Sequence, residues 1–117
     1  MSEKDQHRVQ VVIIGAGPTG LAAANLLGLY GIETLVLERN PVLSTQPKAV
    51  VIDDEGLRIC QALGLQAEVL SHIQPNLNVE YRSGNQLIAQ ITPLNQPNGH
   101  PMISTFHQPG LEAILFH

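Results

Sequence analysis

The chain has 117 residues, of which 44% are hydrophobic, 14% charged and 3% aromatic, and its formal net charge is −4 at pH 7. This length allows one domain, and the apolar fraction is typical of a globular chain and excludes a disordered one. Six Lys and Arg against ten Asp and Glu leave no basic surface for a nucleic acid.

The first part of the chain has the pattern of a βαβ unit. Residues 9–14 are β-branched and mostly apolar, which predicts a strand covered on both faces. A glycine-rich turn follows, and residues 21–30 predict a helix, apolar nearly all round, that Gly31 ends in a left-handed cap. Residues 34–38 predict a second strand. This order within about 30 residues predicts a parallel pair with a right-handed crossover.

The middle of the chain is predicted to be helical. Asp53 or Asp54 is placed to cap a helix that ends at Gly64. Residues 66–71 predict a second, shorter helix. Because acidic residues favour the first turn of a helix, we interpret the run Asp53-Asp54-Glu55 as capping rather than as a metal site.

The last part of the chain predicts a hairpin and a final strand and helix. Residues 79–82 and 86–91 flank a Ser-Gly-Asn turn, as the two strands of a hairpin would. A proline-containing loop leads to a strand at 102–106 and to a helix from near Gly110. That helix has no stop signal, so we expect the protein to continue beyond His117.

The glycine-rich turn carries the strongest functional signal, the pattern Gly15-x-Gly17-x-x-Gly20 between a strand and a helix. Gly15 permits the tight turn, Gly17 lets the backbone approach a pyrophosphate, and Gly20 lets the helix lie close to the strand. The N–H groups at the start of the helix would hold phosphate charge. Glu38, at the end of the second strand, can accept hydrogen bonds from a ribose diol, which favours FAD or NAD over NADP.

Several stretches beyond this turn resemble the FAD-dependent aromatic hydroxylases, the class A flavin monooxygenases. They are residues 15–21, 35–39, 47–58 and 106–109. The last two of these stretches are most similar to family members that hydroxylate phenolic acids such as 3-(3-hydroxyphenyl)propionate. The resemblance covers the chain but only about the first quarter of such an enzyme. It implies an α/β fold: a Rossmann-like FAD-binding βαβ unit with a helical segment and a β-hairpin, in which residues 1–117 are the N-terminal part of an incomplete FAD-binding domain.

The resemblance also implies which residues bind the cofactor. The glycines of the turn would face the FAD pyrophosphate, Glu38 would bind the adenosine ribose, the segment 48–50 would pass beside the flavin, and Gln108 would contact FAD. The cofactor-binding set is Gly15, Ala16, Gly17, Pro18, Thr19, Gly20, Glu38, Arg39, Lys48, Ala49, Val50 and Gln108. Two positions depart from the family: Lys48 stands where Arg is usual and offers a point charge without the planar fork, and Val51 stands where Gly is usual.

The reaction that the resemblance implies is aromatic hydroxylation. NADH or NADPH reduces FAD in this family, and the reduced flavin activates O2 for transfer to a phenolic substrate, with no metal. The cofactor supplies the chemistry, while the protein supplies placement and exclusion of water. The family's later flavin motifs would lie beyond His117, so we assign no catalytic residue here. We expect that the 117 residues alone do not catalyse the reaction.

Three alternatives stay open at this point. Another FAD- or NAD-dependent oxidoreductase would carry the same turn, although a plain dehydrogenase would have a third βα unit where the hairpin is predicted. A nucleotide-binding module without turnover fits as well. Among single residues, Lys48 is either a solvated charge or a contact to flavin or phosphate, and Gln108 is either a helix cap or a cofactor contact.

The remaining residues that could carry chemistry give no site of their own. The histidines lack the spacing of metal ligands and are His7, His72, His100, His107 and His117. The single cysteine, Cys60, lies among apolar neighbours, which predicts a buried small side chain in a reducing compartment. No apolar run approaches the ~20 residues of a membrane span, and the polar first ten residues lack the apolar core of a signal peptide. We therefore expect a cytoplasmic protein.

Overall fold

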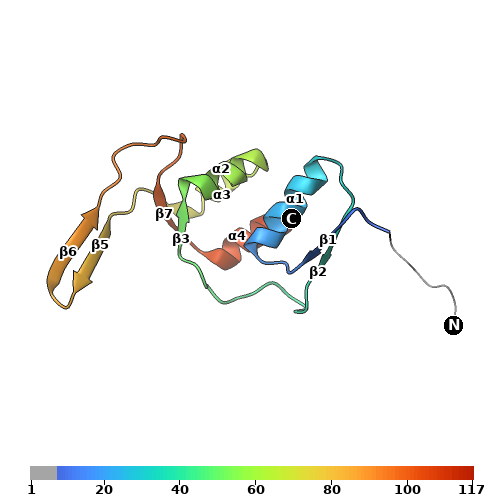
Figure 1. Ribbon diagram of the computed structural model, residues 1–117, viewed down its shortest axis with the longest axis horizontal. Helices are drawn as coiled ribbons and strands as arrows, with labels where there is room; N and C mark the ends of the chain where they lie inside the picture. Colours follow the sequence, from blue (N-terminus) through green and yellow to red (C-terminus); the bar gives the residue numbers. More distant parts are fainter. Residues whose placement is uncertain (1–7) are drawn as a thin grey trace.

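The structure of the protein, a computed structural model, describes residues 8–117. Helices occupy the middle of the molecule, with a small sheet on one side and a long hairpin standing away on the other (Figure 1). The strands are β1 (Val11–Ile14), β2 (Thr34–Leu37), β3 (Val51–Asp53), β4 (Ile73–Gln74), β5 (Val79–Ser83), β6 (Gln86–Ile91) and β7 (Ile103–Phe106). The helices are α1 (Pro18–Leu29), α2 (Asp54–Ala62), α3 (Gln66–Leu70) and α4 (Gln108–Phe116).

The predicted βαβ unit is confirmed. Strands β1 and β2 pair in parallel, with Val11 opposite Thr34 and Ile14 opposite Leu37, and α1 connects them. The helix begins at Pro18, earlier than predicted, because a proline lacks the N–H that a first helical turn leaves unpaired and its fixed φ already suits a helix. The helix ends as predicted, since Gly31 has a φ of +70°.

One face of this small sheet is exposed within residues 8–117, whereas the composition of residues 9–14 is that of a strand covered on both faces. Side chains that alternate along β1 and β2 are half-buried on the side of α1 and open on the other. The open face comprises Val12, Ile14, Leu35 and Leu37, of which Ile14 is 79% exposed. Among the described residues, helix packs on one face of these two strands.

A second sheet, which the sequence did not predict, joins three short strands in the order β3-β7-β4. Both outer strands run antiparallel to β7, with Val51 opposite Thr105 and Ile73 opposite Phe106. The predicted strand at 102–106 is therefore confirmed as β7. Its partners were missed because each has two or three residues and is fixed by pairing with a segment distant in the sequence.

The helices α2 and α3 begin and end close to their predicted bounds. A carboxylate oxygen of Asp53 accepts a hydrogen bond of 2.8 Å from the Gly56 N–H, so Asp53 is the N-cap of α2. A cap of this kind contributes about 1 kcal/mol to helix stability. Gly64, with a φ of +74°, follows the helix as predicted.

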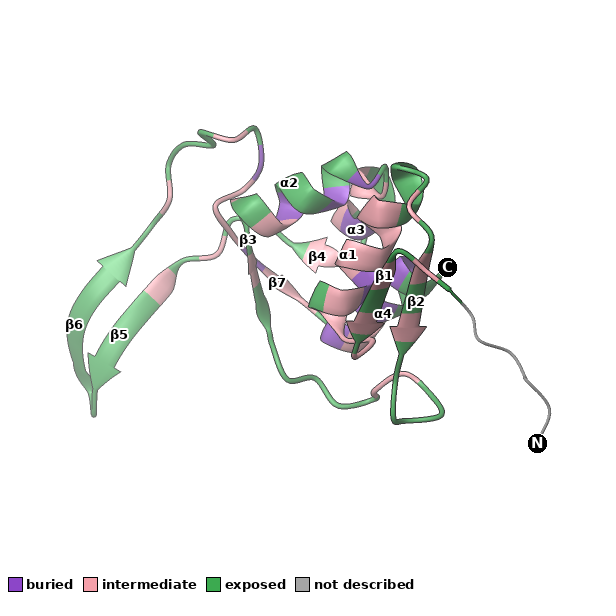
Figure 2. Ribbon diagram, turned by 45° about the vertical axis from the view of Figure 1, so that its right-hand side comes forward, coloured by how far each residue is buried: buried purple, intermediate pink, exposed green. Residues whose placement is uncertain are grey.

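The core lies where the helices of the described chain meet (Figure 2). Its buried apolar side chains come from every one of these helices and the turn between α2 and α3, and are Leu21, Leu57, Cys60, Leu63, Val69, Leu111, Ile114 and Leu115. Burial raises the pKa of the Cys60 thiol, as expected of a packed side chain without a cation beside it. The predicted burial of Cys60 is thus confirmed.

The hairpin of β5 and β6 is confirmed, and it projects from the helical part (Figures 1 and 2). Its turn contains Gly84, whose φ is +57°, and every residue of β6 is exposed. Within residues 8–117, no helix has the length and apolar character that crossing a bilayer requires.

Candidate functional site

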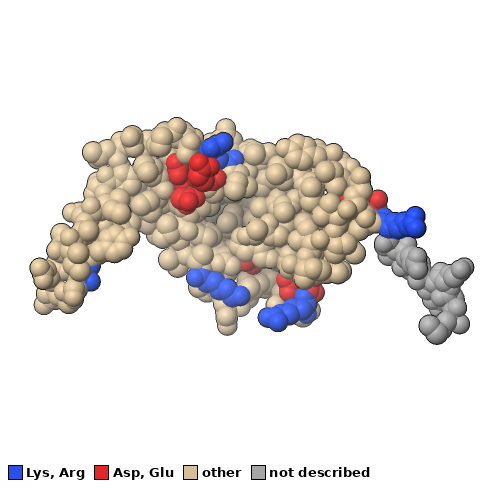
Figure 3. All heavy atoms as spheres, in the orientation of Figure 1, with Lys and Arg blue, Asp and Glu red and all other residues tan. Residues whose placement is uncertain are grey.

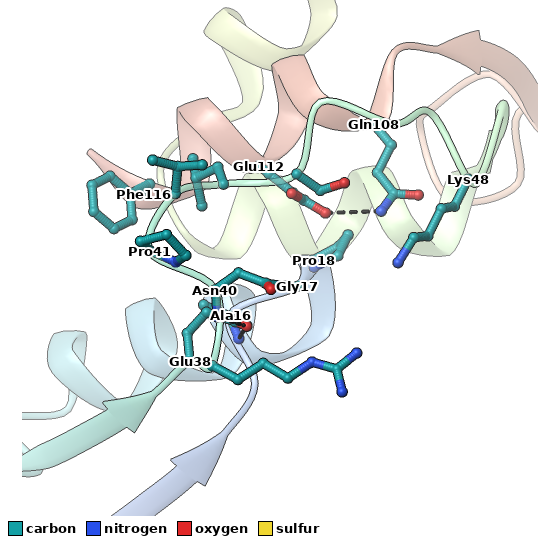
Figure 4. A pocket seen from close by; sticks show the side chains of 14 residues that line it. Ala16, Gly17, Pro18, Glu38, Asn40, Pro41, Lys48, Gln108, Glu112 and Phe116 are labelled. Carbon is teal, nitrogen blue, oxygen red and sulfur yellow. Dashed lines mark hydrogen bonds between the residues drawn. The ribbon is translucent and has the colours of Figure 1, made fainter.

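An open cavity of about 690 Å³ lies where the glycine turn, the loop after β2 and helix α4 meet (Figure 4). Its volume falls in the range of small-molecule sites. Seven of the predicted cofactor-binding residues line it: Ala16, Gly17, Pro18, Glu38, Arg39, Lys48 and Gln108. The other five do not line the cavity but lie within two positions of residues that do, and are Gly15, Thr19, Gly20, Ala49 and Val50.

The glycine turn is shaped by three glycines that act differently. Gly15 has a φ of +106°, which side chains rarely adopt, and its N–H donates to Leu37 at 2.7 Å, joining the turn to β2. A Cβ on Gly20 would overlap the carbonyl oxygen of Gly15, so α1 can start against the turn only with glycine there. At Gly17 a Cβ would meet no atom within 4 Å, which leaves open space in front of the N-terminus of α1.

Glu38 follows β2 and ties the turn to the next loop. One carboxylate oxygen accepts from the Ala16 N–H at 2.8 Å, and the other accepts from the Asn40 N–H at 2.9 Å. These hydrogen bonds, that from Ala16 first, hold the pKa of Glu38 below its ordinary value of 4.5. Each oxygen keeps a further lone pair for a ligand.

The lowered pKa of Glu38 predicts how the turn responds to acid. Protonation removes the negative charge to which the Ala16 N–H donates, so the contribution of this bond to stability is present above pH 4.5 and is lost as the pH falls through the lower folded-state pKa. In an NMR titration, the Ala16 amide and the Glu38 carboxyl carbon should shift together at a midpoint below 4.5. The Glu38→Gln protein should lack the amide transition, and a midpoint at or above 4.5 would contradict the two hydrogen bonds.

Lys48 and Gln108 form the opposite wall of the cavity. Lys48 is exposed, and its ammonium group extends toward the Gly17 side of the cavity (Figure 4). Gln108 is buried and is the first residue of α4, whereas His107 is the N-cap, so the alternative that Gln108 caps this helix is wrong. The helix starts two residues before the predicted Gly110 because Pro109 fits its first turn.

The sequence did not identify Glu112 or the loop residues 40–44 as part of the cavity wall. Glu112 is only 3% exposed and accepts a hydrogen bond of 2.8 Å from Gln108. The available signal was its position four residues after Gln108, which puts both side chains on one face of a helix. A charged residue on that apolar helix was the second signal.

The acidic residues at the start of α2 lie away from this cavity, on the face shown in Figure 3. Asp54 accepts from the Asn98 amide at 2.7 Å, and Glu55 pairs with Arg58 at 3.3 Å. Within residues 8–117, no three His, Cys, Asp or Glu side chains gather as a metal ion would need. His7 lies outside the described residues.

A family model for the FAD binding domain matches residues 8–117. Among curated proteins, a 3-(3-hydroxy-phenyl)propionate/3-hydroxycinnamic acid hydroxylase of Mycobacterium sp. (strain JLS) is 42% identical over 115 residues, which are 97% of this chain and 20% of that enzyme. An enzyme of the same name from Klebsiella pneumoniae subsp. pneumoniae is 41% identical over 113 residues, 96% of this chain and 20% of its own. The chain therefore spans about a fifth of the length of these relatives.

Two solved monooxygenase structures have a similar fold. The p-nitrophenol 4-monooxygenase PnpA of Pseudomonas putida DLL-E4 superposes with a TM-score of 0.80 at 28% identity, over 91% of this chain and 28% of that one. The flavin-dependent monooxygenase PieE, solved in complex with FAD and substrate, gives 0.76 at 27% identity, over 95% of this chain and 22% of its own.

Proposed function

This chain belongs to the FAD binding domain family, and from that membership we propose that residues 1–117 are the N-terminal FAD-binding part of a flavin-dependent monooxygenase. In this proposal the whole enzyme uses NADH or NADPH and O2 to hydroxylate a phenolic acid such as 3-(3-hydroxyphenyl)propionate. The names of the curated relatives support the substrate class. The observation that carries the proposal is the cavity that the glycine turn, Glu38 and Lys48 share.

The residues around the cavity fit the phosphate part of FAD. The space beside Gly17 is open, and a side chain there would fill it. The first N–H groups of α1 have no partner within the helix and lie at its positive end, so they can donate to phosphate oxygens. Lys48 adds a positive charge on the opposite wall. A dianionic pyrophosphate would thus meet donors and positive charge on both sides.

The remaining contacts fit the sugar and the rest of the cofactor. The Glu38 carboxylate has lone pairs left to accept from ribose hydroxyls, and its bond to Ala16 fixes its position beside the turn. Gln108 keeps one amide hydrogen that is not donated to any residue of the described chain. When bound, FAD supplies the redox chemistry, while these residues hold and orient it.

We also propose that the enzyme is cytoplasmic. Its one cysteine, Cys60, is a buried free thiol, which suits a reducing compartment. The curated relatives are named for small phenolic acids as substrates, so the proposed partners are a small aromatic substrate and O2.

The proposal is tested with the whole protein purified without added flavin. A yellow protein that quenches FAD fluorescence, and that oxidises NADH or NADPH faster when a phenolic acid is present, is the expected result. Glu38→Leu serves as the matched variant, because it removes the ribose acceptor at an exposed position. A protein that releases all flavin and binds NAD instead would overturn the proposal in favour of a dehydrogenase. Flavin retention without substrate-stimulated turnover would favour the module without turnover.

A further inference from the structure

The amide of Gln108 is held at both ends inside the protein. Its oxygen accepts from the Ala49 N–H at 2.8 Å. Its nitrogen donates to a carboxyl oxygen of Glu112 at 2.8 Å, the bond drawn as a dashed line in Figure 4. Gln108 is 7% exposed and Glu112 is 3% exposed, so both groups are screened from water. Buried polar groups are costly unless each finds a partner, and here each of the three groups has at least one partner.

This arrangement fixes which way the amide faces. Only the nitrogen of Gln108 can donate to a carboxyl oxygen, and only its oxygen can accept from a backbone N–H. A carboxyl group at position 112 therefore selects the orientation in which the oxygen meets Ala49. The turned-over amide would place an N–H against the Ala49 N–H, leaving both unpaired.

The bond to Ala49 anchors a long segment without helix or strand. Residues 38–50 connect β2 to β3 and form much of the cavity wall. At the end of this segment the Phe106 N–H donates to Val50 at 3.0 Å, and the Gln108 oxygen binds Ala49 beside it. Lys48, the residue before Ala49, carries the ammonium group that lines the cavity. The position of that charge thus depends on how firmly Ala49 is held.

We propose that Glu112 is a positioning residue that acts through the Gln108 amide. It holds the backbone at Ala49 against α4, which places Lys48 on the cavity wall and leaves the second hydrogen of the Gln108 nitrogen as that amide's remaining donor. The inference rests on the proposed function only for the ligand, FAD. The hydrogen-bonded chain from Glu112 to Ala49 exists without it.

The test uses two readouts on the whole protein: hydrogen exchange of the Ala49 amide without FAD, and the Kd for FAD. Glu112→Leu should speed Ala49 exchange about tenfold and weaken FAD binding by a similar factor, the effect of losing about one net hydrogen bond. Glu112→Gln keeps an oxygen that can accept from Gln108, so both readouts should stay within about twofold. Equal Ala49 exchange in the parent, Glu112→Leu and Glu112→Gln proteins would overturn the inference.

An exchange of the two side chains keeps the test decisive if Glu112→Leu does not fold. Gln108→Glu alone sets two carboxyl groups against each other and should speed Ala49 exchange. Adding Glu112→Gln supplies a donor from position 112 to the new carboxylate, whose other oxygen can still accept from Ala49, so exchange should return toward the parent value. Failure of this rescue would overturn the inference. A parent protein that protects Ala49 but does not bind FAD would contradict the proposed function and leave the positioning role intact.

Discussion

Replacing Gly20 with alanine is expected to lower the free energy of unfolding by about 3 kcal/mol, the upper end of the usual cost of overpacking. The added Cβ would overlap the carbonyl oxygen of Gly15 and come within 3.3 Å of the Ile13 side chain. The overlapped atom belongs to the backbone, so no change of rotamer relieves the contact and α1 must move away from the turn. Urea unfolding followed by circular dichroism measures the difference.

Gly28→Ala is the matched control in the same helix. A Cβ at Gly28 would meet no atom within 4 Å, and alanine is the better helix former, so this variant should gain roughly 0.5–1 kcal/mol. Opposite signs for the two alanine variants would show that the close approach at Gly20, and not glycine content in general, sets its cost. A Gly20→Ala protein as stable as the parent would contradict the packing of α1 on the turn.

Gly17→Ala is expected to weaken FAD binding by on the order of 100-fold, because the methyl group displaces phosphate oxygens from about two charge-assisted hydrogen bonds. The free protein should tolerate the change. Gly17 has a φ of −78° and a ψ of −176°, an extended conformation open to any residue, and its Cβ would meet nothing within 4 Å. Titration of FAD fluorescence gives the affinity, and thermal unfolding without FAD gives the stability.

The two glycine variants separate a folding role from a binding role within one turn. Gly17→Ala should change the unfolding free energy of the free protein by less than about 1 kcal/mol, the range of a substitution at an N-cap. Gly28→Ala again serves as the control, with unchanged affinity. An unchanged Kd in the Gly17→Ala protein would contradict the proposed approach of a pyrophosphate to the turn.

The elements that could be predicted are those whose signal is local. The βαβ unit, the hairpin and helix α2 each combine a periodic pattern of hydrophobic residues with a residue that starts or ends the element, such as Gly31 after α1 or Asp53 before α2. The strands β3 and β4 carry no such signal. They exist because β7, more than 25 residues further along the chain, offers them hydrogen-bonding partners.

The candidate site divides in the same way. The glycine turn and Glu38 could be named from spacing, since each position of that fingerprint has a defined geometric role. On the opposite wall, Lys48 and Gln108 could be named only through the family resemblance. Glu112 was missed, because it reaches the cavity only when α4 packs beside the segment 38–50. Apolar content alone does not decide whether a face of β1 and β2 is covered, because it is the same for a covered strand and an uncovered one.

The bond between Glu38 and Ala16 has a kinetic consequence. It joins the turn and the following loop in the protein without a ligand, so the proposed FAD site is already ordered at this end of the cavity. A preorganised site loses little conformational entropy on association. The encounter is then limited by diffusion and orientation rather than by loop closure, and ligands that differ in affinity at this end should differ mainly in how slowly they leave.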